Sequence, residues 1–202
     1  MQPRRIVVGV SGASGSVYAS RFIEVLTRIQ PPVELHLIVT DTAVAIAGHE
    51  NVTLPTSLTP ASRPPDHTGP AGSVTYRYAP DNMFAPIASG SFVHTGMVII
   101  PCSMKTLSAI ATGNASGLMT RAADVCLKER RPLILVVRET PLSRIHMTNM
   151  LAAHDAGAVI LPAMPPFYTN PETILDLVDT IIARVLDTLH IEHDLVVRWG
   201  EE

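Results

Sequence analysis

The chain has 202 residues, enough for one sizeable hydrophobic core and short for two separate domains. Hydrophobic residues make up 47% and charged residues 16%, a balance typical of a packed globular protein rather than a disordered one. The formal net charge of −3 gives no electrostatic basis for binding nucleic acid, which usually requires a basic face. The aromatic fraction of only 4% beside so much aliphatic surface is consistent with burial against copies of the same chain.

The N-terminus, the cysteines and the histidines bear on whether the protein is membrane-bound, secreted or metal-binding. No apolar run reaches the roughly 18 residues that span a bilayer. The N-terminus passes directly into a strand-like run without a signal-peptide pattern. Two cysteines, Cys102 and Cys126, are too few for a disulfide framework or a zinc cluster. No histidine falls into a metal-binding spacing such as H-E-x-x-H. These features predict a soluble cytoplasmic protein with no membrane segment and no metal.

Short apolar runs alternate with segments of helical periodicity along the whole chain. Runs rich in Val, Ile and Leu predict strands covered on both faces at residues 5–10, 33–39, 97–101, 133–138 and 158–161. Helices are predicted at residues 16–29, 106–112, 118–129, 143–156 and 171–189. Gly157 is the expected C-cap of the fourth helix, and Asn170 the expected N-cap of the fifth. This order predicts one α/β domain over residues 1–202, with a doubly wound, Rossmann-like or flavodoxin-like parallel sheet and helices on both faces.

A proline-rich stretch interrupts this alternation. Residues 55–86 hold seven of the 17 prolines and show little periodicity. We expect an exposed loop over residues 53–72 within an irregular stretch at about 53–86. A loop of this length in a compact domain is either functional or disordered. A linker between two domains is the weaker alternative, since too little chain precedes it.

The segment GVSGASG, residues 9–15, lies between the first predicted strand and the first predicted helix. Its three evenly spaced glycines let the backbone turn sharply, and a helix N-terminus offers free N–H groups to an anion. Ser11 and Ser14 add hydroxyl groups. The pattern differs from G-x-G-x-x-G, and the second strand ends in Thr40 rather than an acidic residue, which favours a mononucleotide over a dinucleotide. From the motif alone, a phosphate-binding turn and a tight turn without a ligand both stay open.

Two further strand ends carry polar residues where open α/β sheets bind ligands. After the third strand, Ser103, Lys105 and Thr106 could donate to an anionic group, or Ser103 could simply cap a helix beside a solvated lysine. After the fourth strand come Arg138 and Glu139. Arginine suits phosphate and glutamate can move a proton, but the two could also form an internal ion pair.

The end of the fifth strand and the final helix supply another candidate pair. Tyr168, in the run PPFY, and Arg184 could clamp a phosphate, or the prolines could stiffen a turn whose aromatic rings pack on the sheet. The run KERR at residues 128–131 indicates a solvated helix end. The segment 9–15 does not complete the G-x-S-x-G pattern of a serine nucleophile, so no motif favours hydrolysis.

Several blocks in a set order resemble the flavin prenyltransferases, the UbiX-like proteins of the HFCD-type flavoprotein superfamily. The blocks are GVSGASG, PCSMKTLSAIATG, LMTRAADVCLKERRPLILVVRETPL, NML and GAVILPAMPPFYTNP. The resemblance extends to the terminal RWGEE and omits only the loop at about 53–82. It implies that the turn at residues 9–15 cradles the phosphate of FMN, with Ser14 also close to the reactive ring system. It further implies a homo-oligomer, namely a dodecamer.

The resemblance also implies a reaction. Reduced FMN and dimethylallyl monophosphate would bind side by side. The dimethylallyl group would leave its phosphate, bond to flavin N5 and close onto C6, giving prenylated FMN for UbiD-type decarboxylases. The reaction is metal-independent, so the site itself must stabilise the departing phosphate and an allyl cation. Two alternatives are an FMN-dependent cysteine-type decarboxylase, whose His base and Asn/Met-rich motif we do not find in place, and a non-catalytic flavin carrier.

By position, the resemblance assigns roles to individual residues. The implied catalytic residues are Ser14, Glu50 and Glu139. The implied flavin-binding residues are Gly12, Ala13, Ser14, Thr40, Ser103, Met104, Lys105, Thr106 and Arg138. The implied residues for the dimethylallyl phosphate are Lys128, Arg138, Tyr168 and Arg184, with Lys128 reaching in from a neighbouring subunit. Met83 and Phe84 lie where some members carry Trp, whose ring face could steady a cation.

Overall fold

The computed structural model describes residues 4–55, 67–68, 72–198 and 200. In this part of the chain, seven strands form one sheet in the order β3-β4-β2-β1-β5-β6-β7. The strands are β1 (Arg4–Val10), β2 (Val33–Val39), β3 (His67–Thr68), β4 (Val74–Tyr78), β5 (Gly96–Cys102), β6 (Leu133–Val137) and β7 (Val159–Pro162). All neighbouring strands are parallel except β3, which pairs antiparallel with β4 at the edge. The predicted doubly wound α/β fold is confirmed.

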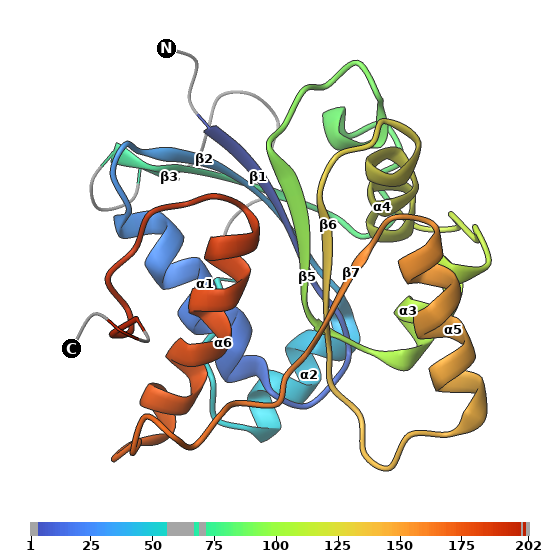
Figure 1. Cartoon of the computed structure of the whole chain (residues 1–202). Coiled ribbons are helices and arrows are strands. Elements are labelled where there is room, and N and C mark those ends of the chain that lie inside the picture. Colours follow the sequence, from blue (N-terminus) through green and yellow to red (C-terminus); the bar gives the residue numbers. More distant parts are fainter. Residues whose placement is uncertain (1–3, 56–66, 69–71, 199, 201–202) are drawn as a thin grey trace.

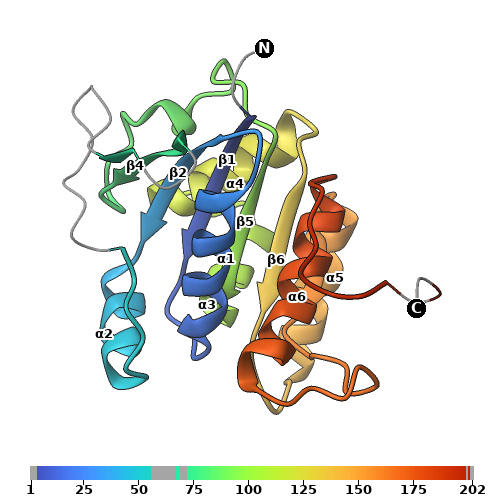
Figure 2. The same cartoon turned by 90° about the vertical axis from the view of Figure 1, so that its left-hand side faces the viewer.

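The helices lie on both faces of the sheet (Figures 1 and 2). They are α1 (Ser16–Arg28), α2 (Asp41–His49), α3 (Met104–Ala111), α4 (Leu118–Lys128), α5 (Arg144–Asp155) and α6 (Ile174–Thr188), with a short 3₁₀ helix η2 (Pro86–Ala88). Helices α1 and α6 pack side by side over one face, as Figure 2 shows, and α3, α4 and α5 cover the other. No helix in the described ranges is long and apolar enough to cross a membrane.

Alternating side chains of the central strands build two separate cores. In β1, Ile6 and Val8 face the α1–α6 side while Val7 faces the α3–α4 side, and all three are fully buried. In β5, Val98 and Ile99 divide between the two sides in the same way. A strand with both faces covered is apolar at most positions, which is why continuous apolar runs predicted these two strands correctly.

Four elements of the described residues were not predicted from the sequence. Strands β3 and β4 lie inside the stretch predicted as irregular, and η2 begins at its last residue. Helix α2 follows β2 directly, where no helix was expected. Residues 56–66 and 69–71 of the expected loop lie outside the described residues.

The start of the last helix also differs from the prediction. Thr173, not Asn170, is the N-cap of α6: its side chain accepts a hydrogen bond from the Asp176 N–H, and the Asp176 carboxylate accepts one from the Thr173 N–H in return. This reciprocal capping box satisfies two N–H groups at once, an advantage that Asn170 could not offer. At the end of α5, the C-cap is Ala156, and Gly157 follows it with φ of 112°, the left-handed conformation that glycine favours.

Candidate functional site

Strands β1 and β5 are neighbours at the point where the strand order of the sheet reverses. Ser11 connects the carboxyl ends of these two strands by hydrogen bonds. Its hydroxyl donates to the Pro101 carbonyl at 2.9 Å and accepts from the Ser103 N–H at 2.8 Å. The side chain is buried, with the residue only 1% exposed. Ligands of open α/β sheets bind at such a switch point, beyond the carboxyl ends of the strands. Ser11, which the sequence suggested as a donor to a ligand, instead holds the two loops of the site in register.

Glu50, at the C-cap of α2, binds the N-terminus of α1. Its carboxylate accepts from the Gly15 N–H at 2.8 Å and from the Ser16 N–H at 2.7 Å. Burial opposes ionisation of this carboxyl, but hydrogen bonds from Ser14, Gly15 and Ser16 outweigh it and lower the pKa below its ordinary value. The first N–H groups of α1 therefore already have an anion. This corrects the expectation that residues 9–15 offer them freely to a phosphate.

Arg138 brings a third element to the same place. Its Nε donates to the Ser14 carbonyl at 3.1 Å, so the end of β6 lies against the turn that follows β1. The neighbouring Glu139 accepts a hydrogen bond from the Thr140 N–H at 3.1 Å. Among the ion pairs of the described residues none joins Arg138 to Glu139, so the alternative of an internal ion pair is not supported.

The backbone of the turn has no room for larger side chains. A Cβ added at Gly12 would lie 2.5 Å from Thr42 Cγ2 on α2. Gly15 has φ of 103°, and a Cβ there would lie 3.1 Å from the Tyr18 ring. Glycine at these two positions is therefore required by close approach and by the left-handed conformation.

The hydroxyl groups expected to bind flavin have structural roles in this chain. Thr40 caps α2 by accepting from the Ala43 N–H at 3.2 Å. Ser103 caps α3 by accepting from the Thr106 N–H at 3.3 Å, and it donates to the Thr106 hydroxyl at 3.1 Å. The N-cap interpretation of Ser103 is thus confirmed. Among the described contacts, no carboxylate binds the start of α3, in contrast to the start of α1.

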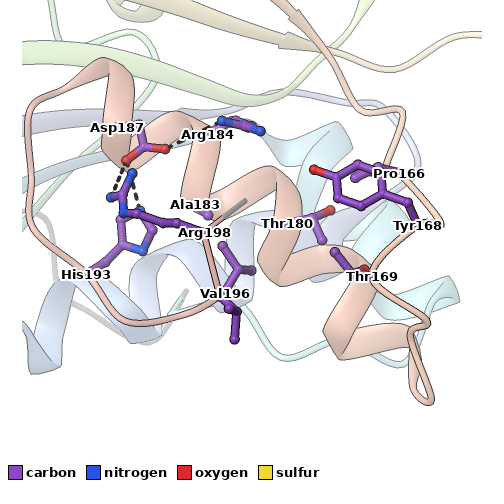
Figure 3. Close-up of a pocket in the computed structure, with 11 residues that line it drawn as sticks. Pro166, Tyr168, Thr169, Thr180, Ala183, Arg184, Asp187, His193, Val196 and Arg198 are labelled. Atoms are coloured by element: carbon purple, nitrogen blue, oxygen red, sulfur yellow. Dashed lines mark hydrogen bonds and ion pairs between the residues drawn. The ribbon is translucent and has the colours of Figure 1, made fainter. Parts of the chain in front are cut away.

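Tyr168 and Arg184 line one cavity of about 330 Å³ between the loop after β7, helix α6 and the C-terminal segment (Figure 3). The Arg184 side chain is 67% exposed, and its Nη1 lies 3.9 Å from Asp187 Oδ2. Tyr168 is 57% exposed, so its ring is not packed on the sheet. The structure therefore brings together the two residues that the sequence suggested as a phosphate clamp.

Lys128 lies apart from the other candidate residues. It is the last residue of α4, and the chain then enters β6 at its amino end. Arg138 follows the carboxyl end of β6, so the two residues lie near opposite ends of this strand. Within one chain, Lys128 pairs with Glu129. This position agrees with the implication that Lys128 would serve the site of a neighbouring subunit.

Three residues near Arg184 had no predicted role. Asp187, His193 and Arg198 line the same cavity and are joined by hydrogen bonds. The sequence carried one signal for them: Asp187 lies three residues after Arg184, the spacing of neighbours on a helix surface. No group of three metal-ligating side chains occurs within the described ranges.

Comparison with known proteins finds relatives that match nearly the whole chain. The family model Flavoprotein matches residues 1–188. Flavin prenyltransferase UbiX of Pseudomonas aeruginosa is 44% identical, with 99% of this chain and 96% of the relative covered. Flavin prenyltransferase PAD1, mitochondrial, of Saccharomyces cerevisiae is 41% identical over 98% of this chain and 76% of its own length.

Solved structures point the same way. AnUbiX (PadA1), in complex with FMN and dimethylallyl pyrophosphate, superposes with a TM-score of 0.86 at 40% identity and covers 98% of each chain. A dodecameric FMN-dependent UbiX-like decarboxylase from Escherichia coli O157:H7 superposes with a TM-score of 0.84 at 38% identity. The match covers 97% of this chain and 99% of the other. The FMN-dependent cysteine decarboxylase SpaF superposes with a TM-score of only 0.55 at 17% identity. The match covers 90% of this chain and 97% of SpaF, and it shows a shared fold alone.

Proposed function

Because the chain belongs to the Flavoprotein family and, within it, to the flavin prenyltransferases, we propose that it transfers a dimethylallyl group from dimethylallyl monophosphate to N5 and C6 of reduced FMN. Identity of 44% over 99% of the chain supports this activity above a cysteine-type decarboxylase or a flavin carrier. The observation in the chain itself that carries the proposal is the meeting of Ser14, Glu50 and Arg138 at the carboxyl edge of the sheet.

The residues at this edge fit a flavin. Gly12 and Gly15 let the turn after β1 pack closely against Thr42 and Tyr18, which fixes the position of the turn at this strand end. Ser103, Lys105 and Thr106 begin α3 at the adjacent strand end, where N–H groups and a positive dipole suit the FMN phosphate. We therefore assign the phosphate to the start of α3, since Glu50 holds the start of α1.

FMN supplies N5 and C6 as the nucleophilic atoms when it is bound. The C–O bond of the donor breaks, the electron pair leaves with the phosphate, and one C5H8 unit is added to the flavin overall. In this scheme Arg138 and Arg184 neutralise the departing phosphate, and the Tyr168 hydroxyl donates to it. Glu50, held ionised by its hydrogen bonds, stabilises positive charge near the ring, and Glu139 takes up the proton released on ring closure.

The oligomeric state, product acceptor and location belong to the same proposal. We propose a dodecamer, because the related Escherichia coli protein is dodecameric and Lys128 must come from another subunit to reach this site. We propose that prenylated FMN passes to a UbiD-type decarboxylase and that the protein works in the cytoplasm.

Mass spectrometry of the released flavin tests the activity. The protein is incubated anaerobically with reduced FMN and either dimethylallyl monophosphate or the pyrophosphate, since AnUbiX binds the latter. A gain of one C5H8 unit with the monophosphate supports the proposal, and unchanged FMN with both donors rejects it. A gain with the pyrophosphate alone would reassign the donor.

Tyr168→Phe tests the phosphate clamp within this scheme. Loss of the hydroxyl removes a donor to the phosphate, so we expect weaker use of dimethylallyl monophosphate with FMN still bound. Tyr76→Phe is the matched control, because it removes a hydroxyl from β4 while leaving a ring to stack on His36. Loss of FMN from Tyr168→Phe would show that Tyr168 serves the flavin instead.

A further inference from the structure

The C-terminal segment after α6 folds back and binds a carboxylate in the last turn of that helix. Asp187 Oδ1 accepts from Arg198 Nη2 at 2.8 Å and from His193 Nε2 at 3.2 Å. His193 Nδ1 accepts from the Leu195 N–H, which leaves the ring proton on Nε2 to donate to Asp187. The His193 side chain is only 2% exposed. Asp187 is therefore the anchor that holds the segment of residues 193–198 to α6.

Asp187 also lies beside Arg184, a residue of the proposed phosphate clamp. Arg184 lies one helical turn before it, and the distance from Arg184 Nη1 to Asp187 Oδ2 is 3.9 Å. That separation is too long for a hydrogen bond. In Figure 3 the Arg198 guanidinium meets Asp187 on the side away from Arg184. Arg184 and Asp187 thus form only a long ion pair, through Oδ2, while Arg198 holds Oδ1 at hydrogen-bond distance.

A carboxylate beside a phosphate site must be neutralised, or it repels the phosphate and captures the arginine that should bind it. Burial opposes ionisation of Asp187, but hydrogen bonds from Arg198 and His193 outweigh it and lower its pKa. Asp187 therefore stays negative at neutral pH. Arg198 brings a full positive charge to Oδ1 at 2.8 Å and so balances the charge of this carboxylate.

We propose that Arg198 is a positioning residue for the prenyl-donor site: by binding Asp187 it competes with Arg184 for this carboxylate, keeps their ion pair long and leaves the Arg184 guanidinium available to the donor phosphate. This inference rests on the proposed function, because it takes Arg184 as a phosphate-binding residue. It assigns the C-terminal segment a part in substrate binding beyond covering α6.

A set of variants separates this role from simple anchoring. Arg198→Gln frees Asp187 to capture Arg184, Asp187→Asn removes the competing carboxylate, and the double variant removes both. Arg28→Gln is the matched control, since Arg28 is an exposed arginine paired with Glu24 on α1. For each protein, KM for dimethylallyl monophosphate, kcat and the FMN dissociation constant are measured anaerobically.

We expect Arg198→Gln to raise KM about tenfold, the scale of one charge-assisted hydrogen bond, with FMN binding unchanged. Asp187→Asn should change KM by less than about twofold, and adding it to Arg198→Gln should restore KM to that level. Rescue by the second substitution is the readout that a purely structural role would not produce. An equal defect in all three variants would show that the contact only anchors the segment.

Two other outcomes also overturn the inference. No change in Arg198→Gln would show that Arg184 does not depend on Arg198. A defect in Arg198→Gln that Asp187→Asn leaves uncorrected would make Arg198 a direct phosphate ligand instead. Calorimetric binding of dimethylallyl monophosphate to protein loaded with oxidised FMN gives the same comparison without turnover. That measurement tests Arg198 even where the wild-type protein fails to prenylate FMN, so failure of the two proposals can be told apart.

Discussion

Replacing Glu50 by Gln removes the charge that holds α2 to the start of α1. In the native chain the two carboxylate oxygens accept from the Gly15 and Ser16 N–H groups at 2.8 and 2.7 Å. A glutamine side chain offers one oxygen and one NH₂ group, so one backbone N–H loses its acceptor and faces another donor. We expect a loss of about 1 kcal/mol in the free energy of unfolding, a figure that allows for solvent screening at a partly exposed side chain.

The pH dependence of this loss gives the sharper test. The pKa of Glu50 is lowered in the folded protein, so its contribution is complete at neutral pH. The contribution is lost as the pH falls below the ordinary value of 4.5 and through the lower folded-state pKa. The stability gap between wild type and Glu50→Gln should therefore close in acid.

Urea denaturation at a series of pH values measures the gap, with equal m-values required for the comparison. Glu172→Gln, a change of the same type at an exposed residue, is the control. Equal stability of wild type and Glu50→Gln at neutral pH would refute the reasoning. So would a gap that persists unchanged at a pH below the lowered pKa of Glu50, where this carboxyl is protonated in the folded and the unfolded protein alike.

Three further predictions concern the turn, the last helix and the oligomer. Gly12→Ala should lower the free energy of unfolding by about 1–3 kcal/mol, because the added Cβ would meet Thr42 on α2. The loss should be smaller in a Thr42→Gly background, and urea denaturation of the wild type, the two single variants and the double variant measures it. Thr173→Ala should cost about 1 kcal/mol while Thr173→Ser retains most of the cap; equal losses would contradict the capping box. Lys128→Ala and Arg138→Ala should each be inactive alone and regain partial prenylation when co-expressed in mixed oligomers, whereas no recovery would place both residues in one subunit's site.

The sheet could be predicted because its strands are buried on both faces. Strands β1, β5 and β6 contain continuous apolar runs, and β2 ends in one, which is the pattern that a covered strand imposes. Strand β4 carries the mixed sequence VTYRY near the edge of the sheet and is mostly half-buried, so its pattern is weaker. Helix α2 is rich in small residues and buries only Ala43 and Ala47, which leaves little periodicity to detect.

The site was predicted in outline for a topological reason. Ser14 and Arg138 are 124 positions apart in the chain, yet each follows the carboxyl end of a parallel strand, and these ends share one edge. The partner of the α1 N-terminus could not be found in the same way. Glu50 reaches Gly15 only because α2 runs along that edge, and α2 itself was not predicted. The sequence therefore did not show that the N–H groups of Gly15 and Ser16 already bind a carboxylate, because that carboxylate comes from another element.

The proposed phosphate set cannot be completed within one chain. Arg138 lies at the carboxyl edge of the sheet, whereas Lys128 ends α4 at the amino edge. The apolar side chains on the surface add a second argument: Phe84 is 99% exposed, in the loop after β4, and Ile174, at the start of α6, is 74% exposed. Large apolar side chains at this exposure are covered in stable assemblies of many soluble proteins. Contact between copies would bury such residues and deliver Lys128 to its neighbour at the same time, so that assembly and completion of the donor site become one event. A monomer would then keep the turn, Glu50 and Arg138 for the flavin while lacking one cation for the leaving phosphate.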